Sequence, residues 1–543
     1  MNTTTPTGDG AGALPLGLPD EATLTRLANE FFRELPGQHP PAVLSGEPAV
    51  LPGEPGPAVL PPRQPATAGF APPLPVAPPE LVTRPRELLA TPPQWPGPAF
   101  ARPGGGAAEP SFYFINERLA APGPAAAYPA SPDMLPFDVE TVRRQFPILS
   151  ERINGQQLVW LDNAATTQKP QAVIDRLSYF YAHENSNIHR AAHTLAARAT
   201  DAYEAARATI ADFIGAPSSE TIVYTRGATE AINLVAQTWG RQHIRDGDEI
   251  LISHLEHHAN IVPWQQLAEQ AGATLRVIPV DDEGQLLLDA YTDLLSDRTR
   301  LVAVSHVSNT LGTIVPVSEV IAAAHRAGAR VLIDGAQSVA HLPTDVRGLD
   351  ADFYVFSGHK VFAPTGIGVL YGKPELLETM PPWQGGGNMI RDVTFARTTY
   401  QGPPARFEAG TGSIGDAVAL GAALDFVRQV GQPAIASYEH DLLGYATSEL
   451  QAVPGLRLIV TAPEKASVLS FVLDGCRPED VGSALDKDGI AVRAGHHCAQ
   501  PILRRYGLES TVRASLAMYN TRGEVDLLVA ALNRLAADTG RRR

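Results

Sequence analysis

Lys360 directly follows a run of residues that is typical of a buried strand, in the sequence FYVFSGHK. An amine at a strand end, flanked by small and hydroxyl residues, is suited to form a Schiff base, because desolvation lowers the pKa of lysine and keeps it nucleophilic. Taken alone, the position is more typical of a surface lysine after a strand. The interpretation therefore depends on which other groups the fold would bring to this lysine.

A carboxylate ends a second strand-like run, in RVLIDGAQSVAH, where Asp334 is expected to be buried. An unpaired buried carboxylate is costly, so we expect a partner such as a protonated pyridine nitrogen, whose ring would then be a better electron sink. Gln337 could donate to an oxygen on that ring. In YTRGATEAINLVAQ, Ala228 and Thr229 lie at a predicted helix N-terminus, which favours a phosphate. These groups predict a site for pyridoxal 5'-phosphate.

Four further side chains are candidates to complete this cofactor site. His257, in HLEHHANIVPW, could stack on the pyridine face. Asn309, in SHVSNTLGT, is a candidate contact to the ring oxygen. Ser357 and His359, on either side of Gly358, could add hydrogen bonds to the phosphate.

Cys498 supplies the candidate nucleophile, in the polar loop of GIAVRAGHHCAQP. The thiolate is the reactive form of cysteine, and Arg493, His496 and His497 could lower the pKa of this thiol. The other cysteine, Cys476, is more typical of a small buried residue or a chance surface thiol. Two cysteines in 543 residues indicate no disulfide framework and fit a reducing cytosol.

Arg513, in VRASLAMYN, is a candidate anchor for substrate. A guanidinium can bind the carboxylate of an amino acid through two parallel hydrogen bonds, although a structural ion pair would use the same residue type. Arg493 is a second candidate for substrate binding. His189 and Arg190, in NIHRAAH, could line the entrance to the site. We assign no residue to a metal.

The elements that must position these residues alternate between strand-like and helical runs. The strand-like runs are TIVYT, EILIS, TLRVIPV, RLVAVSHV, RVLIDGA, FYVFS and GIGVLY, and the alternation predicts an α/β fold with a mostly parallel sheet. After about residue 430, LRLIV, VLSFVL and GIAVRAG lie between helices. We therefore expect a large domain over 135–430 and a small α+β domain over 431–543.

The first 134 residues differ in composition, because they hold about 30 of the 48 prolines, a density typical of disorder. Two less proline-rich islands interrupt this extension. Asp20 to Leu35 has helical spacing of apolar residues, and Ser111 to Ala120 is aromatic. Each island could be read by a partner protein or could dock back on the parent domain.

The formal net charge of -15 argues against a general nucleic-acid binder. No run of about 20 apolar residues predicts a membrane span, and the first residues lack the features of a signal peptide. We therefore expect a cytoplasmic protein.

Residues 137 to 539 resemble the aminotransferase class V group, of PLP-dependent transferase fold type I, and within it the Suf-type (group II) cysteine desulfurases. The motifs that carry the resemblance are RGATEAINLVA, EHHANIVPWQ, HVSNTLGT, DGAQSV, DFYVFSGHK, PTGIGVLYG, RFEAGT, AVRAGHHCAQP and RASLAMYNT. One departure is Ala228, where Suf-type relatives often carry a threonine, which could slightly weaken the binding of phosphate.

This resemblance implies that Lys360 forms the Schiff base and that Asp334 pairs with the pyridinium. It implies that Arg513 binds the substrate carboxylate, and that Cys498 takes sulfur from L-cysteine as a persulfide while L-alanine is released. It further implies that Thr411 of RFEAGT reaches the phosphate of a neighbouring subunit, hence a homodimer. Selenocysteine lyase and cysteine sulfinate desulfinase share the fold and motifs and are the alternatives.

The extension resembles that of cysteine desulfurases carried as cargo in family 2A encapsulin nanocompartments, which implies a shell protein as partner and a location inside the shell. The alternative is a linker or docking segment with no role in shell targeting. The short loop around Cys498 is similar to that of enzymes that use a SufE- or SufU-like sulfur acceptor. The sequence leaves open whether the sulfur goes to iron–sulfur cluster assembly, storage or stress defence.

Overall fold

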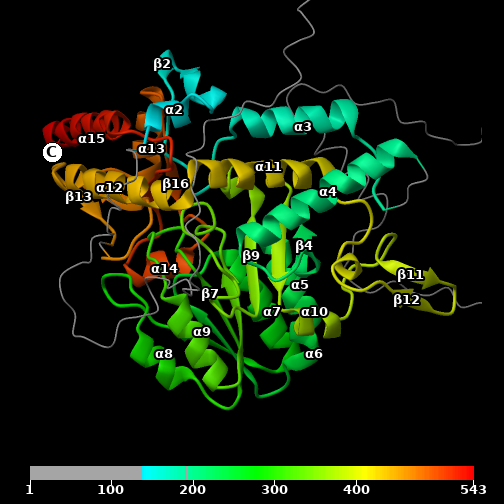
Figure 1. Ribbon diagram of the computed structural model, residues 1–543. Coiled ribbons are helices and arrows are strands. Elements are labelled where there is room, and N and C mark those ends of the chain that lie inside the picture. Colours follow the sequence, from blue (N-terminus) through cyan, green and yellow to red (C-terminus); the bar gives the residue numbers. More distant parts are fainter. Residues whose placement is uncertain (1–136, 190–192, 461, 543) are drawn as a thin grey trace, which may run out of the picture. The chain divides into compact units, whose positions relative to one another are not determined.

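The computed structural model describes residues 137–189, 193–460 and 462–542 (Figure 1). The extension over 1–134, both of its islands and Arg190 lie outside the described residues. No helix in the described part of the chain is both long enough and apolar enough to cross a membrane.

A seven-stranded sheet forms the centre of the described residues, as the sequence predicts, and its strand order is β4-β10-β9-β8-β7-β5-β6. Strand β10 runs antiparallel to both of its neighbours, and every other pair is parallel. Each strand coincides with one of the seven predicted runs. The strands are β4 (Ile222–Thr225), β5 (Glu249–Ser253), β6 (Thr274–Ile278), β7 (Thr299–Ser305), β8 (Arg330–Asp334), β9 (Phe353–Ser357) and β10 (Gly368–Gly372).

Helices cover both faces of this sheet. Successive side chains of a strand point to opposite faces, and the apolar side chains on each face pack against helices. On β9, Tyr354 and Phe356 belong to one apolar cluster, and Phe353 and Val355 belong to the other. The first face is covered by α3 (Gln171–His183), α4 (Thr194–Phe213), α8 (Leu288–Leu294), α9 (Val317–Arg326) and α11 (Ile414–Val430). The second is covered by α5 (Ala228–Val235), α7 (Val262–Ala271) and α10 (Pro374–Thr379).

A second, four-stranded antiparallel sheet comes from the C-terminal part of the chain, in the order β13-β14-β17-β16. Its strands are β13 (Leu456–Leu458), β14 (Val468–Leu473), β16 (Arg493–Gly495) and β17 (Thr511–Ser515). Apolar side chains of α12 (Gln432–Gln451), α13 (Pro478–Lys487) and α15 (Arg522–Arg542) pack with this sheet in one cluster. A short helix, α14 (Gln500–Arg505), follows the loop that carries Cys498.

The segment before α3 also contacts this C-terminal part. It holds α2 (Val139–Arg143) and the short strands β1 (Arg152–Ile153), β2 (Gln156–Gln157) and β3 (Val159–Trp160). Strand β3 pairs in parallel with β15 (Ile490–Ala491). The predicted boundary between residues 430 and 431 stays a prediction. A hairpin of β11 (Ile390–Val393) and β12 (Thr398–Tyr400) is a further element that the sequence analysis did not anticipate.

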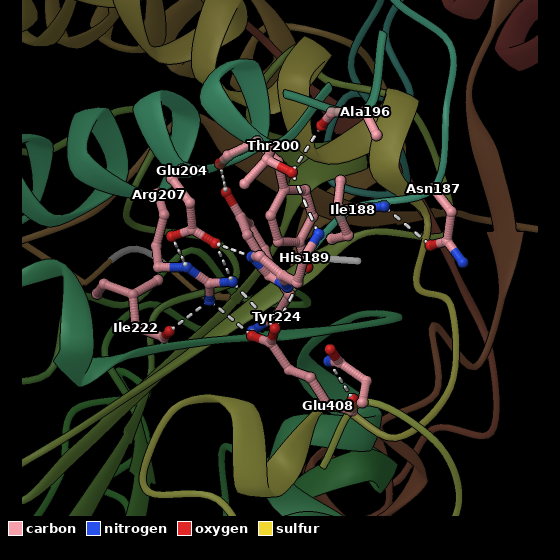
Figure 2. Close-up of polar contacts among 12 residues, drawn as sticks. Asn187, Ile188, His189, Ala196, Thr200, Glu204, Arg207, Ile222, Tyr224 and Glu408 are labelled. Carbon is pink, nitrogen blue, oxygen red and sulfur yellow. Dashed lines mark hydrogen bonds and ion pairs between the residues drawn. The ribbon is translucent and has the colours of Figure 1, made fainter. Parts of the chain in front are cut away.

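A buried ion pair ties α4 to the segment that precedes α11 (Figure 2). Arg207 Nη1 lies 2.6 Å from Glu408 Oε1, and these side chains are 2% and 9% exposed. Glu408 Oε1 also accepts a hydrogen bond of 2.8 Å from the backbone N–H of Tyr224 in β4. Glu204 contacts the same guanidinium at 2.9 Å, but its side chain is 42% exposed.

We expect the substitution Glu408→Gln to lower the free energy of unfolding by about 3–5 kcal/mol, because it leaves the Arg207 charge buried without its main counter-charge. The matched substitution Glu204→Gln, which removes an exposed partner of the same guanidinium, should cost less than about 1 kcal/mol. Urea unfolding followed by circular dichroism measures both. Equal losses in the two variants would contradict the assignment of the buried pair as the stabilising one.

Candidate active site

A cavity of about 460 Å³ lies where the carboxyl ends of the central strands meet residues of the small sheet. Parallel strands place their carboxyl ends at one edge of a sheet, where ligands of open α/β folds bind. Of the predicted site residues that the structure describes, all except His189 and Thr411 line this cavity. Those that do so are Ala228, Thr229, His257, Asn309, Asp334, Gln337, Ser357, His359, Lys360, Arg493, Cys498 and Arg513.

Lys360 and Asp334 supply opposite charges from adjacent strands. Lys360 ends the 3-10 turn η5 (Gly358–Lys360) directly after β9, and Asp334 is the last residue of β8. Burial lowers the pKa of Lys360 to about 8, although the Asp334 carboxylate acts against this change. Burial also raises the pKa of Asp334, against a hydrogen bond of 2.9 Å from the backbone N–H of Ala336. A substantial fraction of the lysine is thus neutral at physiological pH, whereas an ordinary lysine is almost fully charged.

One end of the cavity is lined by the residues expected to hold a phosphate. Ala228 and Thr229 begin α5, and Ser357 Oγ accepts a hydrogen bond of 2.9 Å from the backbone N–H of Ala228. The turn before α5 requires a glycine opposite it, because a Cβ added at Gly368 would lie 2.4 Å from the Cα of Gly227. Burial and the charges of Lys360 and Lys169 lower the pKa of His359 to about 4, so its ring is neutral.

The predicted ring contacts come from three loops. His257 Nδ1 accepts a hydrogen bond of 3.1 Å from the backbone N–H of Ala259, so Nε2 carries the proton of the neutral ring. Burial and the charge of Lys360 lower the pKa of His257 to about 3. Gln337 Nε2 donates to the carbonyl of Ala164 at 2.6 Å. Asn309 Oδ1 is buried and has no hydrogen-bond partner among the described residues, so it is open to a ligand.

The Cys498 loop is held in an unusual backbone conformation. His497 and Cys498 have φ angles of 53° and 54°, a left-handed conformation that costs roughly 1–2 kcal/mol for each L-residue. Two hydrogen bonds of 2.8 Å hold the loop, from Asn309 Nδ2 to the His497 carbonyl and from the His258 N–H to the Cys498 carbonyl. The Cys498 side chain is exposed and also lines the cavity.

The histidine beside the thiol differs from the expectation. Burial, with the charges of Arg513 and Arg493, lowers the pKa of His497 to about 3, so this ring is neutral at physiological pH. It therefore cannot favour the Cys498 thiolate as a cation. The cationic side chains that interact electrostatically with Cys498 are those of Lys360, Arg493 and Arg513.

Asp162 is a charged residue that the sequence analysis missed. Its carboxylate lies 2.8 Å from Arg493 Nη2 and 3.3 Å from Arg513 Nη2, so it joins the two predicted substrate arginines. Arg513 Nη1 donates to the carbonyl of Asn309 at 2.8 Å. Asp162 follows the short apolar run Leu158–Leu161, and a carboxylate ending an apolar run is the signal that also singled out Asp334.

The residues after Asp162 support the turn that carries Lys360. The carbonyl of His359 accepts hydrogen bonds from the backbone N–H of Thr167 at 3.1 Å, from Thr166 Oγ1 at 3.0 Å and from Lys169 Nζ at 3.2 Å. Burial lowers the pKa of Lys169 to about 8. Nothing in the sequence NAATTQK indicates this role, because it depends on a contact across the fold.

His189 and Thr411 lie away from the cavity. Thr411 lines a second hollow together with Ile188, Arg226, Glu230 and Trp383. His189 Nε2 lies 2.9 Å from Glu204 Oε1 (Figure 2). A role at the entrance of the cavity for His189 and a role in a neighbouring subunit for Thr411 stay predictions.

The residues present fit pyridoxal 5'-phosphate. Asp334 is buried with one backbone donor, which suits a carboxylate that awaits a cationic ring nitrogen. The unpaired Asn309 Oδ1, the neutral His257 ring and the hydroxyls of Thr229 and Ser357 supply the remaining kinds of contact. Among residues 137–542 that the structure describes, no group of three or more His, Cys, Asp or Glu side chains could hold a metal ion.

Comparisons with known proteins agree with this geometry. The family described as Aminotransferase class-V matches residues 159–528. A cysteine desulfurase of Synechococcus elongatus is 67% identical over 399 residues, which are 74% of this chain and 64% of that protein. A probable cysteine desulfurase of Mycolicibacterium paratuberculosis is 59% identical over 474 residues, 86% of this chain and 68% of that protein. The chain thus spans about two-thirds of the length of these relatives.

A solved structure gives the same fold. The cysteine desulfurase CsdA of Escherichia coli matches with a TM-score of 0.69 and 42% identity, over 74% of this chain and 99% of that one. The family model therefore covers most of the described residues and none of the extension.

We expect trinitrobenzenesulfonate, which reacts with neutral amines, to label Lys360 of the cofactor-free protein with a midpoint near pH 8. The amine is protonated below its pKa, so the rate rises as the pH increases through that value. The substitution Asp334→Asn removes a negative charge that favours the ammonium form, and the midpoint should move to lower pH. Mass spectrometry of the labelled peptides measures this.

Lys465 is the internal control for this titration. Its pKa is also about 8, but burial alone lowers it. Asp334→Asn should leave the midpoint of Lys465 unchanged, and a parallel shift at both lysines would contradict the coupling of Lys360 to Asp334.

Proposed function

Because the chain belongs to the aminotransferase class V family, we propose that it is a Suf-type cysteine desulfurase, which converts L-cysteine to L-alanine and keeps the sulfur as a persulfide on Cys498. The observation that carries the proposal is that Lys360 and Cys498, from different sheets, line one cavity. The chain spans only about two-thirds of the cysteine desulfurases of Synechococcus elongatus and Mycolicibacterium paratuberculosis. We therefore infer the activity from the residues of the site as well as from the similarity to these proteins.

Pyridoxal 5'-phosphate, when bound, supplies an electron sink that acidifies the Cα–H bond of an amino acid. Arg513 orients the substrate by binding its carboxylate. The Lys360 amine, with a pKa of about 8, takes the Cα proton. The Cys498 sulfur then attacks the substrate sulfur, so that an S–S bond forms as the Cβ–S bond breaks. The ammonium formed on Lys360 is the source of a proton for the three-carbon product, which leaves as alanine, and His257 would relay protons during these steps.

Two other activities would use the same residues. A selenocysteine lyase or a cysteine sulfinate desulfinase needs the same amine, carboxylate and arginine, but neither requires the thiol in the same way. The exposed position of Cys498, in a loop fixed by the bonds from Asn309 and His258, favours the desulfurase.

A homodimer is part of the proposal. Thr411 lies outside the cavity of its own chain, in a hollow lined by residues of α5 and of the segment before α11. A hydroxyl in this position is available to a second copy of the chain, whose phosphate it would contact.

The extension over 1–134 is proposed to direct the enzyme into an encapsulin nanocompartment in the cytoplasm. Its composition is that of a flexible tether, which lets a folded dimer hang inside a shell while short motifs bind the wall. The alignment with the Mycolicibacterium paratuberculosis protein covers 86% of the chain, so it includes part of the extension. A linker without shell targeting is the alternative.

The persulfide needs an acceptor, and the exposed Cys498 suits transfer to a SufE- or SufU-like protein. Delivery of the sulfur to iron–sulfur cluster assembly is one use of such a transfer, and storage and stress defence are others.

We expect Cys498→Ala to bind pyridoxal 5'-phosphate normally but to form alanine from L-cysteine about a thousandfold more slowly, or slower still, as is typical when a nucleophile is removed. The absorbance of the bound cofactor reports its binding, and alanine is measured directly. Cys476→Ala is the matched control and should keep full activity. Normal sulfide release by Cys498→Ala would refute the role of this thiol.

The same Cys498→Ala variant separates the alternatives when it is given L-selenocysteine. A desulfurase that depends on the thiol keeps activity on selenocysteine, because selenium leaves more readily, and loses activity on cysteine. Equal retention of both activities would favour the lyase.

Removal of residues 1–134 should leave desulfurase activity unchanged and abolish co-purification with a shell protein. The residues assigned to the chemistry all lie outside the extension, so the deletion should leave kcat and KM for L-cysteine unchanged. Pull-down with a co-expressed family 2A shell protein measures the second. Undiminished shell association after the deletion would leave the extension as a linker only.

A further inference from the structure

A buried carboxylate directly precedes His257 in the chain. The Glu256 side chain is fully buried, and it does not line the cavity. Its Oε1 accepts hydrogen bonds from Ser253 Oγ and, at 3.1 Å, from the backbone N–H of Ser305. Its Oε2 accepts from Asn260 Nδ2 at 2.6 Å and from Ser305 Oγ at 2.7 Å. Because all four donors are uncharged, it is hydrogen bonds that offset the cost of burying this group.

These bonds join the carboxyl ends of two neighbouring strands to the turn that follows one of them. Ser253 is the last residue of β5, and Ser305 is the last residue of β7, which pairs with β5. Asn260 ends the 3-10 turn η4 (His258–Asn260). The turn therefore cannot move relative to the strand ends without breaking hydrogen bonds of Glu256. Ser305 also lines the cavity, so this anchor lies directly behind the cavity wall.

The anchored turn supplies two contacts of the active site. His257 lines the cavity, and the backbone N–H of Ala259 holds its ring by donating to Nδ1 at 3.1 Å. The next residue, His258, donates its backbone N–H to the carbonyl of Cys498 at 2.8 Å. The side-chain Nε2 of His258 accepts a hydrogen bond of 3.3 Å from the backbone N–H of Gln500. One turn thus places the His257 ring and holds the thiol loop.

The donors around Glu256 require an acceptor at both of its oxygens. Asn260 Oδ1 accepts a hydrogen bond of 2.8 Å from Trp264 Nε1, so Asn260 Nδ2 must face Glu256. The backbone N–H of Ser305, at the other oxygen, can only donate. A carboxylate satisfies both donors, whereas the amide of a glutamine has one acceptor. Whichever way that amide is turned, its Nε2 meets either Asn260 Nδ2 or the Ser305 N–H, donor against donor.

We propose that Glu256 is a positioning residue, which acts through the 256–260 turn to hold the His257 ring at the cavity and the Cys498 loop beside it. This inference rests on the proposed function, because that function assigns the ring and the thiol their steps in sulfur transfer. It deepens the function by naming a group outside the cavity on which the transfer depends.

Two variants test the hydrogen bonds themselves. Glu256→Gln keeps the size of the side chain but sets donor against donor. The double variant, Glu256→Gln with Asn260→Asp, exchanges the carboxylate and the amide, so that the new carboxylate accepts from both the glutamine amide and Trp264 Nε1. Glu249→Gln is the matched control, because Glu249 is also a buried carboxylate of β5 but lies at the other end of that strand.

The test uses the full chain loaded with pyridoxal 5'-phosphate. Burial raises the pKa of Glu256 to about 7, so at about pH 8.5 its carboxylate is ionised. In Glu256→Gln, we expect hydrogen exchange of the backbone amides of residues 257–260, measured by mass spectrometry, to become at least about tenfold faster. We expect kcat for alanine formation from L-cysteine to fall at least about tenfold, because small displacements of reacting groups are costly.

Binding of L-alanine separates positioning from a general structural role. Its dissociation constant, from absorbance titration, should change less than about threefold in Glu256→Gln, because Lys360 and Arg513 lie on other elements. The double variant should return hydrogen exchange and kcat to near the wild-type values, and Glu249→Gln should change none of the three quantities. A purely structural role would instead weaken the binding of L-alanine as much as it lowers kcat.

Either wild-type exchange or wild-type kcat in Glu256→Gln would overturn the inference, and so would a loss of L-alanine binding equal to the loss of kcat. If Glu256→Gln does not fold, the double variant decides, and a folded double variant that recovers neither exchange nor kcat overturns the inference. Alanine formation by the wild-type chain is measured separately. Its absence would overturn the proposed desulfurase, whereas unchanged exchange in an active enzyme would overturn only the role of Glu256.

Discussion

The site depends on the contacts of Asn309, because this residue joins the two sheets that supply its halves. Its side-chain Nδ2 donates to the carbonyl of His497, and its own carbonyl accepts from Arg513 Nη1. Both bonds are 2.8 Å long and buried. One loop residue after β7 therefore fixes the cysteine loop and the predicted substrate arginine against the strand ends that hold Lys360 and Asp334. A displacement of this loop would separate the thiol from the amine, even with both sheets intact.

Burial sets the charges of the site as much as the residue types do. Withdrawal from water brings the pKa of Lys360 to about 8, and it makes His257, His359 and His497 neutral. The negative charge of Asp162 then keeps Arg493 and Arg513 ionised, because it favours the charged form of both guanidinium groups. A site that binds a carboxylate group and also holds an amine with a lowered pKa needs both effects, because an unscreened cluster of cations would bind anions with little discrimination.

Much of this arrangement could be predicted from the sequence, for physical reasons. Except for the edge strand β6, the strands of the large sheet are short runs of almost entirely buried residues, a pattern typical of strands covered on both faces. Polar residues that directly follow such runs, such as Asp334 and Lys360, must meet at one edge of a parallel sheet. Asp162 and Thr166 escaped this reasoning, because they follow a strand of two residues whose partner, β15, lies far along the chain. His497 is neutral because it is buried near Arg513 and Arg493, and the residues next to it in the sequence do not indicate this burial.

The left-handed backbone at His497 and Cys498 is best explained by two functions of the Cys498 side chain. Within the proposed function, the thiol must reach a substrate held beside Lys360 and must afterwards present its persulfide to an acceptor outside the cavity. A cysteine in a regular strand would face either the interior or the solvent. Two consecutive left-handed residues turn the chain sharply, so that Cys498 lines the cavity and yet stays exposed. The bonds from Asn309 and His258 to the carbonyls of these two residues offset the cost of that conformation, which is why the loop can be short.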